Sequence, residues 1–379
     1  MQRRIRIVSV GIVLVILLIG IIVMNNNSNN KYSFTQDGIK YALTLDGNEV
    51  TSFPSKGMYK AQVTCVGADG RWLYDDWKLA IENITSDDVT CDIKFETIPK
   101  TYLNDYIISL SGKIQGTGQV VNENGYRYEG KNPNNYIWFN NEYWRIIGVF
   151  DSASHGVSGK NLVKIIRAET LDGLAWHKSN TNDWTASSLK LLLNGAYYNA
   201  QDGTSSGYCY GYSTTATANC DYTKRGIQSG YRGMIASVTW HLGGYSSNSA
   251  TTDAFYGYER GTTVYSGRPT STTGYIGLMY PSDYGYSVLS SSCARTTNLG
   301  SYNSANCAGQ SWLYGKGYEW TLTPFSSNSL SVFILDNNGY VGTFYANSGY
   351  GSRPVLYLDA SVYKIDGDGS LNNPYIVGM

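Results

Sequence analysis

The stretch NPNNYIWFNNEYWRIIGVFD, residues 132–151, decides the fold class because its pattern is that of a β-hairpin. Apolar and polar residues alternate on both sides of Asn140–Asn141, which is the period of a half-buried strand. Two asparagines between such runs are typical of a tight turn. We therefore predict one strand over Tyr136–Phe139 and a second over Tyr143–Phe150.

The chain that follows the hairpin is also mainly β. NLVKIIRAET (161–170) predicts a strand. NDWTASSLKLLLNGAYYN (182–199) predicts the clearest helix, with Asp183 as N-cap and an apolar stripe of Leu189, Leu192 and Leu193. Further strands are predicted, between long loops, in TGYIGLMYP (273–281), YEWTLTP (318–324), SVFILDNNGYVGTFY (331–345) and GSRPVLYLDASVYKI (351–365).

The segment before the hairpin predicts a separate small domain. Residues 32–98 alternate apolar and polar positions between turn sequences, and Cys65 and Cys91 fall in two of the expected strands. We predict a small immunoglobulin-like β-sandwich over 32–98, stapled by one disulfide. Residues 99–118 are interpreted as a linker that could contain a short helix. The fold class is then mainly β, or α+β.

The N-terminus predicts a membrane anchor. MQRRIR (1–6) precedes IVSVGIVLVILLIGIIVM (7–24), and an uncharged run of this length comes close to the ~30 Å of a bilayer core. A cleaved signal peptide is the alternative, but its apolar region usually spans about 7–15 residues before a small-residue site. The sequence favours an uncleaved single-pass anchor in the cell membrane, with residues 1–6 cytoplasmic, a spacer at 25–31, and the rest extracellular.

Cysteine and charge agree with an extracellular setting. The six cysteines allow 15 connectivities, and we predict pairing between sequence neighbours. Neither the cysteine spacing nor the three histidines resembles a zinc site, so disulfides are the better interpretation. Equal numbers of basic and acidic residues give no field that would recruit nucleic acid. The cysteines are Cys65, Cys91, Cys209, Cys220, Cys293 and Cys307.

Six segments keep an order that resembles a known family. They are YIWFNNEYWRIIG, NDWTASSLKLLLN, YIGLMYPSDYGY, YEWTLTPFSS, VFILDNNGYVG and SRPVLYL, and the chain ends in a GDG…NPY tail. Together they resemble Gram-positive, gut-type bacterial surface proteins with a C-terminal domain of unknown function. The resemblance implies that residues 119–379 form a C-type-lectin-like head of the formylglycine-generating (sulfatase-modifying-factor-like) variety, rich in irregular loops.

The resemblance does not supply an activity. The enzyme branch of that fold oxidises a cysteine with its own catalytic cysteines, and no such pair maps onto this sequence. Its calcium-dependent lectins use E-P-N or Q-P-D loops, and neither triplet occurs here. We therefore predict no catalytic residues from the resemblance.

The tyrosine-rich stretch 196–320 is the best clue to function. It holds eighteen of the 34 tyrosines but only thirteen charged residues, among Gly, Ser, Thr and Asn. Antibody paratopes have this composition, although tyrosines can equally pack long loops onto a core. The two cysteine rings within the stretch are suited to presenting a rigid surface. The predicted ligand contacts are Tyr256, Tyr258, Arg260, Tyr265, Trp312, Tyr314 and Tyr318.

Other candidate sites match their motifs less well. Asp366, Asp368 and Ser370 begin like an EF-hand, but its later ligand positions fall on apolar residues, so we favour a closing turn over a Ca²⁺ site. His177 and His241 each follow a tryptophan and are interpreted as structural. Arg353 is expected to lie buried against a carboxylate or carbonyl groups. Glycoside cleavage would need two converging carboxylates from Glu142, Glu259 and Glu319.

The sequence therefore favours a membrane-anchored, adhesin-like extracellular binding protein whose head contacts a glycan or a protein. We expect no cofactor, no metal and no nucleic-acid partner. The alternatives are an extracellular hydrolase that acts on carbohydrate or cell wall, with Glu259 and Glu319 facing each other across a groove, and a structural component of the cell envelope, in which the tyrosines would be buried.

Overall fold

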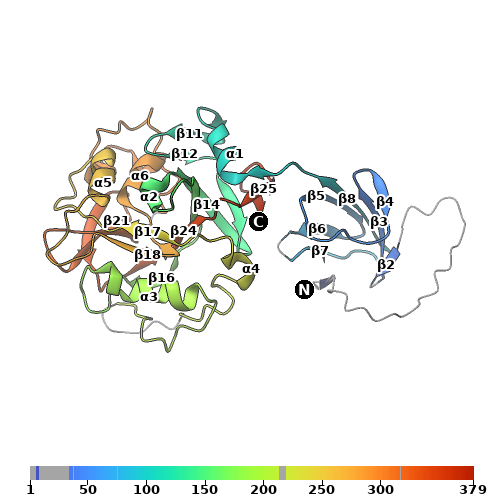
Figure 1. Cartoon of the computed structure of the whole chain (residues 1–379), viewed down its shortest axis with the longest axis horizontal. Helices are drawn as coiled ribbons and strands as arrows, with labels where there is room; N and C mark the ends of the chain where they lie inside the picture. The colour runs from blue at the N-terminus through green and yellow to red at the C-terminus, as the bar shows by residue number, and fades with distance from the viewer. Residues whose placement is uncertain (1–5, 8–33, 37, 75, 213–218, 316) are drawn as a thin grey trace, which may run out of the picture. The chain divides into compact units, whose positions relative to one another are not determined.

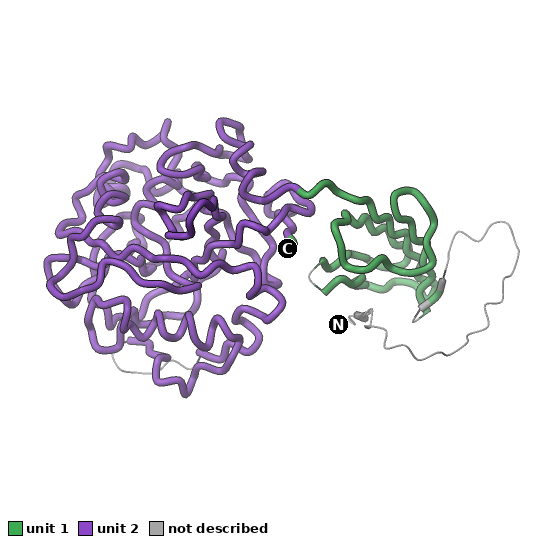
Figure 2. The backbone as a smooth tube through the Cα atoms, in the orientation of Figure 1, with its two compact units in different colours: residues 1–100, 378 green, residues 101–377, 379 purple. Residues whose placement is uncertain are grey.

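The computed structural model describes residues 6–7, 34–36, 38–74, 76–212, 219–315 and 317–379. It is mainly β, with 39% strand and 15% helix. The described residues up to Lys100 form one compact unit, here called the small unit, and residues 101–377 form a second, here called the head (Figure 2).

The small unit is a sandwich of two sheets around an aromatic core. The rings of Trp72 and Trp77 meet edge to face at 5.2 Å, and Phe95 packs against Trp72 at 4.9 Å. One sheet has the order β1-β7-β6 and the other β2-β3-β8-β5, with β4 on β3. The strands are β1 (Arg6–Ile7), β2 (Phe34–Gln36), β3 (Ile39–Leu45), β4 (Asn48–Val50), β5 (Tyr59–Val66), β6 (Asp69–Leu73), β7 (Lys78–Glu82) and β8 (Val89–Thr97).

The immunoglobulin-like prediction is wrong in its disulfide and its pairing. Cys65 of β5 and Cys91 of β8 are directly opposite partners within one sheet, whereas the immunoglobulin disulfide joins two sheets. In addition, β3 pairs with β8 in parallel. The small β-sandwich itself is confirmed, but its disulfide staples neighbouring strands instead of tying its two layers together.

The predicted anchor at 7–24 lies outside the described residues, apart from Ile7, as do the spacer at 25–31 and residues 1–5 of the predicted cytoplasmic tail. Arg6–Ile7 form β1 and pair with Ile81 and Ala80 of β7. For these two residues the structure differs from the predicted tail and anchor, because they pair as a strand with the edge of β7. Of the helices in the described ranges, none has the length and apolar character needed to cross a membrane.

The head begins at Thr101, so the predicted boundary at 119 and linker at 99–118 are wrong from that residue on. The short helix is confirmed as α1 (Leu103–Ser109). Leu103, Ile107 and Leu110 are buried in the main core of the head, which fixes this segment to it. The preceding β9 (Thr101–Tyr102) pairs with β25 (Tyr363–Asp366).

The hairpin that decides the fold class is confirmed. β13 (Tyr136–Phe139) pairs antiparallel with β14 (Glu142–Phe150). Asn140 and Asn141 have φ values of 58° and 59°, the left-handed conformation of a tight hairpin turn. The hairpin lies in an eleven-stranded sheet of order β10-β11-β12-β14-β13-β26-β25-β9, in which β15 pairs with β14 and β24, and β19 with β24. The remaining strands are β10 (Ile114–Gln115), β11 (Thr117–Asn122), β12 (Tyr126–Asn132), β15 (Leu162–Arg167), β19 (Ile276–Gly277), β24 (Val355–Leu358) and β26 (Tyr375–Gly378).

The predicted helix at 182–199 forms as three short helical pieces. Asp183 accepts a hydrogen bond from the Thr185 backbone and so caps a 3₁₀ turn, η1 (Trp184–Ala186). Ser187, not Asp183, caps the α-helical part, α3 (Ser188–Leu192), which continues into the π-helical turn η2 (Leu193–Tyr197). The predicted leucine stripe of Leu189, Leu192 and Leu193 is buried, as expected.

A second sheet carries the exposed aromatic rings described below, and its strands β16 and β21 are labelled in Figure 1. Its order is β16-β23-β20-β21-β22, and a separate pair joins β17 to β18. These strands are β16 (Leu171–Ala175), β17 (Val238–His241), β18 (Ser271–Gly274), β20 (Glu319–Pro324), β21 (Ser331–Leu335), β22 (Val341–Tyr345) and β23 (Gly349–Ser352). The remaining helices are α2 (Ser152–His155), α4 (Ser229–Arg232), α5 (Thr252–Glu259), α6 (Pro281–Ser287), η3 (Leu299–Ser301) and η4 (Ala308–Gln310).

All three predicted disulfides are present: Cys65–Cys91, Cys209–Cys220 and Cys293–Cys307. Disulfides persist in oxidising compartments. They are consistent with an extracellular or secreted protein.

Candidate functional site

Exposed aromatic rings gather around strands β20, β22 and β23 of the second sheet. Tyr318 precedes β20 and stacks on Tyr350 of β23, with ring centroids 5.0 Å apart and planes inclined by 17°. Phe344 of β22 meets Tyr350 edge to face at 5.2 Å, and Tyr345 lies beside Phe344. Phe344, Tyr345 and Tyr318 are 42%, 55% and 38% exposed. These four rings, together with Tyr212, are called the aromatic patch.

Tyr212 joins the patch through a disulfide ring. Tyr210, next to Cys209 of the Cys209–Cys220 disulfide, lies beside β16, because the Ala175 backbone N–H donates to its carbonyl. The Tyr212 backbone lies against Gly349 of β23, and its side chain is 70% exposed. Tyr212 therefore presents an aromatic side chain to solvent, and the rigidity predicted for the cysteine rings stays a prediction.

The phenols of Tyr318 and Tyr350 stay neutral at physiological pH. Partial burial and the neighbouring Tyr318 raise the pKa of Tyr350 to about 12. The charge of Asp336, together with a hydrogen bond to it, raises the pKa of Tyr318. Neutral phenols offer a flat apolar face and a hydroxyl at its edge. The patch can therefore stack on a ligand ring and hydrogen-bond to it at the same time.

The seven predicted contact residues do not meet in one place. Only Tyr318 belongs to the aromatic patch. Tyr258 stacks on Tyr245 at 3.9 Å, Tyr314 donates to the Asn337 carbonyl, and Tyr265 lies near Arg268. Tyr256 and Arg260 contact each other elsewhere, with the guanidinium 3.5 Å from the ring centre.

Trp312 is a correction to the predicted surface. It is only 6% exposed, and its indole N–H donates to the Tyr128 carbonyl at 2.8 Å. Arg145 covers its ring at 4.7 Å. The amphipathic indole has thus found its polar partner inside the head, and the ring is not available to a ligand.

Sequence reasoning missed Tyr212, Phe344, Tyr345 and Tyr350. Phe344 and Tyr345 lie in a predicted strand, but the sequence does not show whether either ring is exposed, because consecutive residues of the neighbouring strand β21 are all buried. The place of Tyr212 and Tyr350 depends on pairing between segments far apart in the chain, which a single sequence does not reveal.

Each carboxylate considered for hydrolysis has an arginine partner, and Glu259 and Glu319 are also buried, whereas the Glu142 side chain is 22% exposed. Glu319 is buried and accepts from Arg353 at 2.6 Å, while Arg353 also donates to the Leu313 carbonyl. This confirms the structural role predicted for Arg353. Glu142 pairs with Arg167 at 2.7 Å. A general acid must reach the bond that it protonates, and these contacts turn both carboxylates toward protein partners.

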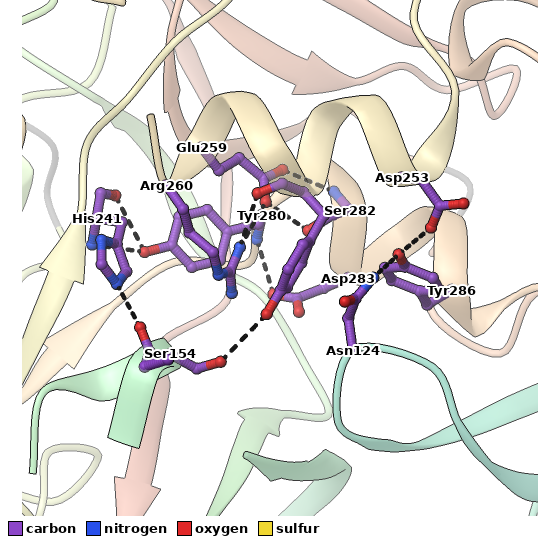
Figure 3. Close-up of polar contacts among 12 residues, drawn as sticks. Asn124, Ser154, His241, Asp253, Glu259, Arg260, Tyr280, Ser282, Asp283 and Tyr286 are labelled. Atoms are coloured by element: carbon purple, nitrogen blue, oxygen red, sulfur yellow. Dashed lines mark hydrogen bonds and ion pairs between the residues drawn. The ribbon is translucent and has the colours of Figure 1, made fainter. Parts of the chain in front are cut away.

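Glu259 belongs to a buried cluster of charges between α5, α6 and the main sheet (Figure 3). Helices α5 and α6 lie side by side, and the α6 backbone N–H of Ser282 donates to Glu259 at 2.9 Å. Asp283, also on α6, pairs with Arg127 at 3.1 Å and with Lys164 at 2.5 Å. Arg127, Lys164, Glu259, Arg260 and Asp283 are called the ion cluster.

The histidines and the C-terminal turn largely behave as predicted. The His177 ring accepts a hydrogen bond from the Ser179 backbone, and burial lowers its pKa. Gly367 and Gly369 have φ values of 86° and 80°, and Asp368 accepts from the Ser370 backbone at 2.9 Å, so the segment is the expected turn. In the part of the chain that the structure describes, no group of three or more His, Cys, Asp or Glu side chains is arranged to hold a metal ion.

Comparison of the chain with protein-family models, with curated proteins and with solved structures gave no match. The resemblance to bacterial surface proteins and to the lectin-like fold therefore stays a prediction. What the structure defines by itself is a mainly β, disulfide-bonded protein whose head carries an exposed aromatic patch and a buried ion cluster.

Proposed function

We propose that this is a membrane-anchored extracellular binding protein and that the aromatic patch is its contact surface for a glycan. The observation that carries the proposal is the stacked pair of Tyr318 and Tyr350 with Phe344 beside it. Large exposed apolar patches on a folded protein mark interaction sites. Ring faces are electron-rich, so the C–H groups of a sugar ring pack on them, and the phenol hydroxyls bond to sugar hydroxyls.

The alternatives have less support. A hydrolase needs two carboxylates that face substrate, whereas Glu259 and Glu319 are buried against protein partners. A purely structural envelope component predicts buried tyrosines. Seven tyrosines of the stretch 196–320 are indeed buried, but Tyr212 and Tyr318 are exposed. An exposed aromatic cluster costs solubility and is of no use to a scaffold, which favours binding.

The test is a glycan-array screen of the full chain in detergent, with a Tyr318→Ala variant. Tyr143→Ala is the matched control, because Tyr143 has the same 38% exposure but lies on the hairpin strand β14. We expect chelator-resistant binding that falls about tenfold or more in Tyr318→Ala, equivalent to ~1.4 kcal/mol, and is unchanged in Tyr143→Ala.

Equal loss in both variants, or an array without any binding, would overturn the glycan proposal. Binding that disappears with chelator would also contradict it, since aromatic stacking requires no metal. That result would direct attention to Asp366 and Asp368, the alternative Ca²⁺ site.

A further inference from the structure

The ion cluster holds more positive than negative charge. Asp283 is the shared partner of two cations, Arg127 and Lys164, and the side chains of all three are 1% exposed. Burial lowers the pKa of Lys164 to about 8, so it is still largely protonated near neutral pH. A third cation, Arg260, pairs with Glu259 at 3.3 Å. Three cations thus share two carboxylates.

Glu259 does not fully supply the second negative charge. It is enclosed, and burial raises its pKa to about 7, with the charge of Asp283 adding to the rise and Arg260 and Ser282 opposing it. Near neutral pH about half of the molecules therefore carry Glu259 uncharged. An uncompensated charge in a protein interior is costly, so an anion that enters this region is favoured.

Two guanidinium nitrogens of the cluster are ready to bind such an anion. Arg127 Nη2 and Arg260 Nε are buried and have no hydrogen-bond partner among the described residues. Both guanidinium groups approach the ring of Tyr256, at 5.7 Å for Arg127 and 3.5 Å for Arg260. Buried donors are nearly always paired in folded proteins, which makes two unpaired donors beside one ring a sign of a ligand site.

His241 is half-buried, and its carbonyl oxygen accepts from Tyr280, whose ring lies 5.6 Å from the Arg260 guanidinium (Figure 3). The His241 Nε2 lies 3.1 Å from the Ala153 carbonyl oxygen. A carbonyl only accepts, so Nε2 carries the hydrogen. Burial and the charges of Arg260 and Lys164 lower the pKa of His241, which keeps the ring neutral and leaves a lone pair on Nδ1. A hydroxyl of a ligand can donate to that atom.

We propose that Arg127, Arg260 and His241 form a binding site for one carboxylate group of a small hydroxylated ligand. The excess positive charge lies between one and two units, depending on the protonation of Glu259, and the planar guanidinium groups match a carboxylate in geometry. The ligand would reach the site past Arg260, whose side chain is 14% exposed, and past the half-buried Tyr256. This site rests on other residues than the aromatic patch and is independent of the proposed function.

The experiment is a calorimetric titration of the full chain with lactate and glucuronate, compared with glucose and inorganic phosphate. Binding of the two hydroxy acids, weaker binding of phosphate and none of glucose at this site are expected. Arg260→Gln should weaken the binding of lactate and glucuronate by about tenfold or more. The control is Arg268→Gln. Arg268 is a half-buried arginine of the head that pairs with Thr181, and its substitution should leave the affinities for lactate and glucuronate unchanged.

A second variant guards against misfolding of Arg260→Gln. Glu259→Gln removes the competing anion. At about pH 8 lactate and glucuronate should therefore bind to the variant several-fold more tightly than to wild type. At about pH 5.5, where Glu259 of the wild type is already protonated, the two proteins should bind them equally. The Arg260 Nε–H signal in an NMR spectrum should shift on addition of lactate. No binding up to about 100 mM, phosphate binding more tightly than lactate, or weaker binding to Glu259→Gln at pH 8 would overturn the proposal.

Discussion

Tyrosines lie in the aromatic patch and beside the ion cluster, and their surroundings in the two regions are opposite. Beside the ion cluster, Tyr280 is fully enclosed, its hydroxyl donates to the His241 carbonyl, and burial raises its pKa far above the ordinary value. In the patch, Tyr318 is exposed, and the charge of Asp336 is the main cause of its raised pKa. The same residue type is scaffold in one region and available surface in the other, so tyrosine content alone does not locate function.

The two regions also differ in what a substitution leaves behind. A side chain removed from the ion cluster leaves a buried charge without its partner, which is among the costliest defects in a folded protein. A ring removed from the patch leaves its neighbours facing water. Stability should therefore depend strongly on the ion cluster and weakly on the patch, and ligand binding at the patch should show the reverse.

The largest effect is expected for Asp283→Asn, which removes the charge that Arg127 and Lys164 share. Two buried cations then repel each other without a counter-charge. We expect a loss of about 3–5 kcal/mol in the free energy of unfolding of the head, measured by urea denaturation.

Asp172→Asn is the matched control for this experiment. Asp172 belongs to a looser and partly exposed pair with Arg225, at 3.6 Å with the Asp172 side chain 42% exposed. Its loss should cost about 0–1 kcal/mol. If both variants lost equal stability, burial would not be what distinguishes the ion cluster.

The second effect is a pH dependence that comes from Glu259. Burial raises its pKa from an ordinary value of 4.5 to about 7. Between these values the folded head binds a proton that the unfolded chain has released, so the contribution of Glu259 to stability is full below pH 4.5 and lost as pH rises through 7. Glu259→Gln lacks this titration.

Wild type should therefore lose about 1–3 kcal/mol of unfolding free energy relative to Glu259→Gln between about pH 5 and pH 8. Urea denaturation at several pH values gives this difference directly, and it cancels the titration of the three histidines. A difference that stays constant, or moves the other way, would show that Glu259 is ionised throughout this range.

Local patterns were enough to predict much of the fold. The Asn140–Asn141 turn requires left-handed backbone that asparagine tolerates, and the leucines of 182–199 repeat at helical spacing, so neighbouring residues carry the information. The start of the head was not predictable in this way. Leu103 and Ile107 belong to the head only because they pack against its core, and that contact is made with residues distant in sequence.

The candidate site was predicted less well, for the same reason. Tyr318 was found because it lies in the tyrosine-rich stretch, and Trp312 was wrongly assigned to the surface because composition does not report burial. Arg260 was predicted as a ligand contact, but the charges of its cluster, Arg127 and Asp283, lie 133 positions before it and 23 after it in the numbering of the chain. Only the folded topology brings strand β12 and helix α6 together.

The smallest effect on stability is expected in the aromatic patch, and it can be compared with a buried ring on the neighbouring strand. Phe344 of β22 is 42% exposed, whereas Phe333 of β21 is fully buried. Phe344→Ser should change the unfolding free energy by less than about 1 kcal/mol, because the ring is partly exposed and only its contacts with the Tyr350 and Tyr345 rings are lost. Phe333→Ala should cost about 3–5 kcal/mol through the cavity that it leaves.

The same Phe344→Ser protein should bind glycan at least about fivefold more weakly than wild type, although its urea midpoint is nearly unchanged. Measuring both quantities on one preparation separates a binding surface from a structural one. A large fall in the urea midpoint would mean that Phe344 supports the sheet. Unchanged stability with unchanged binding would remove Phe344 from the contact surface and leave the stacked pair of Tyr318 and Tyr350 to account for it.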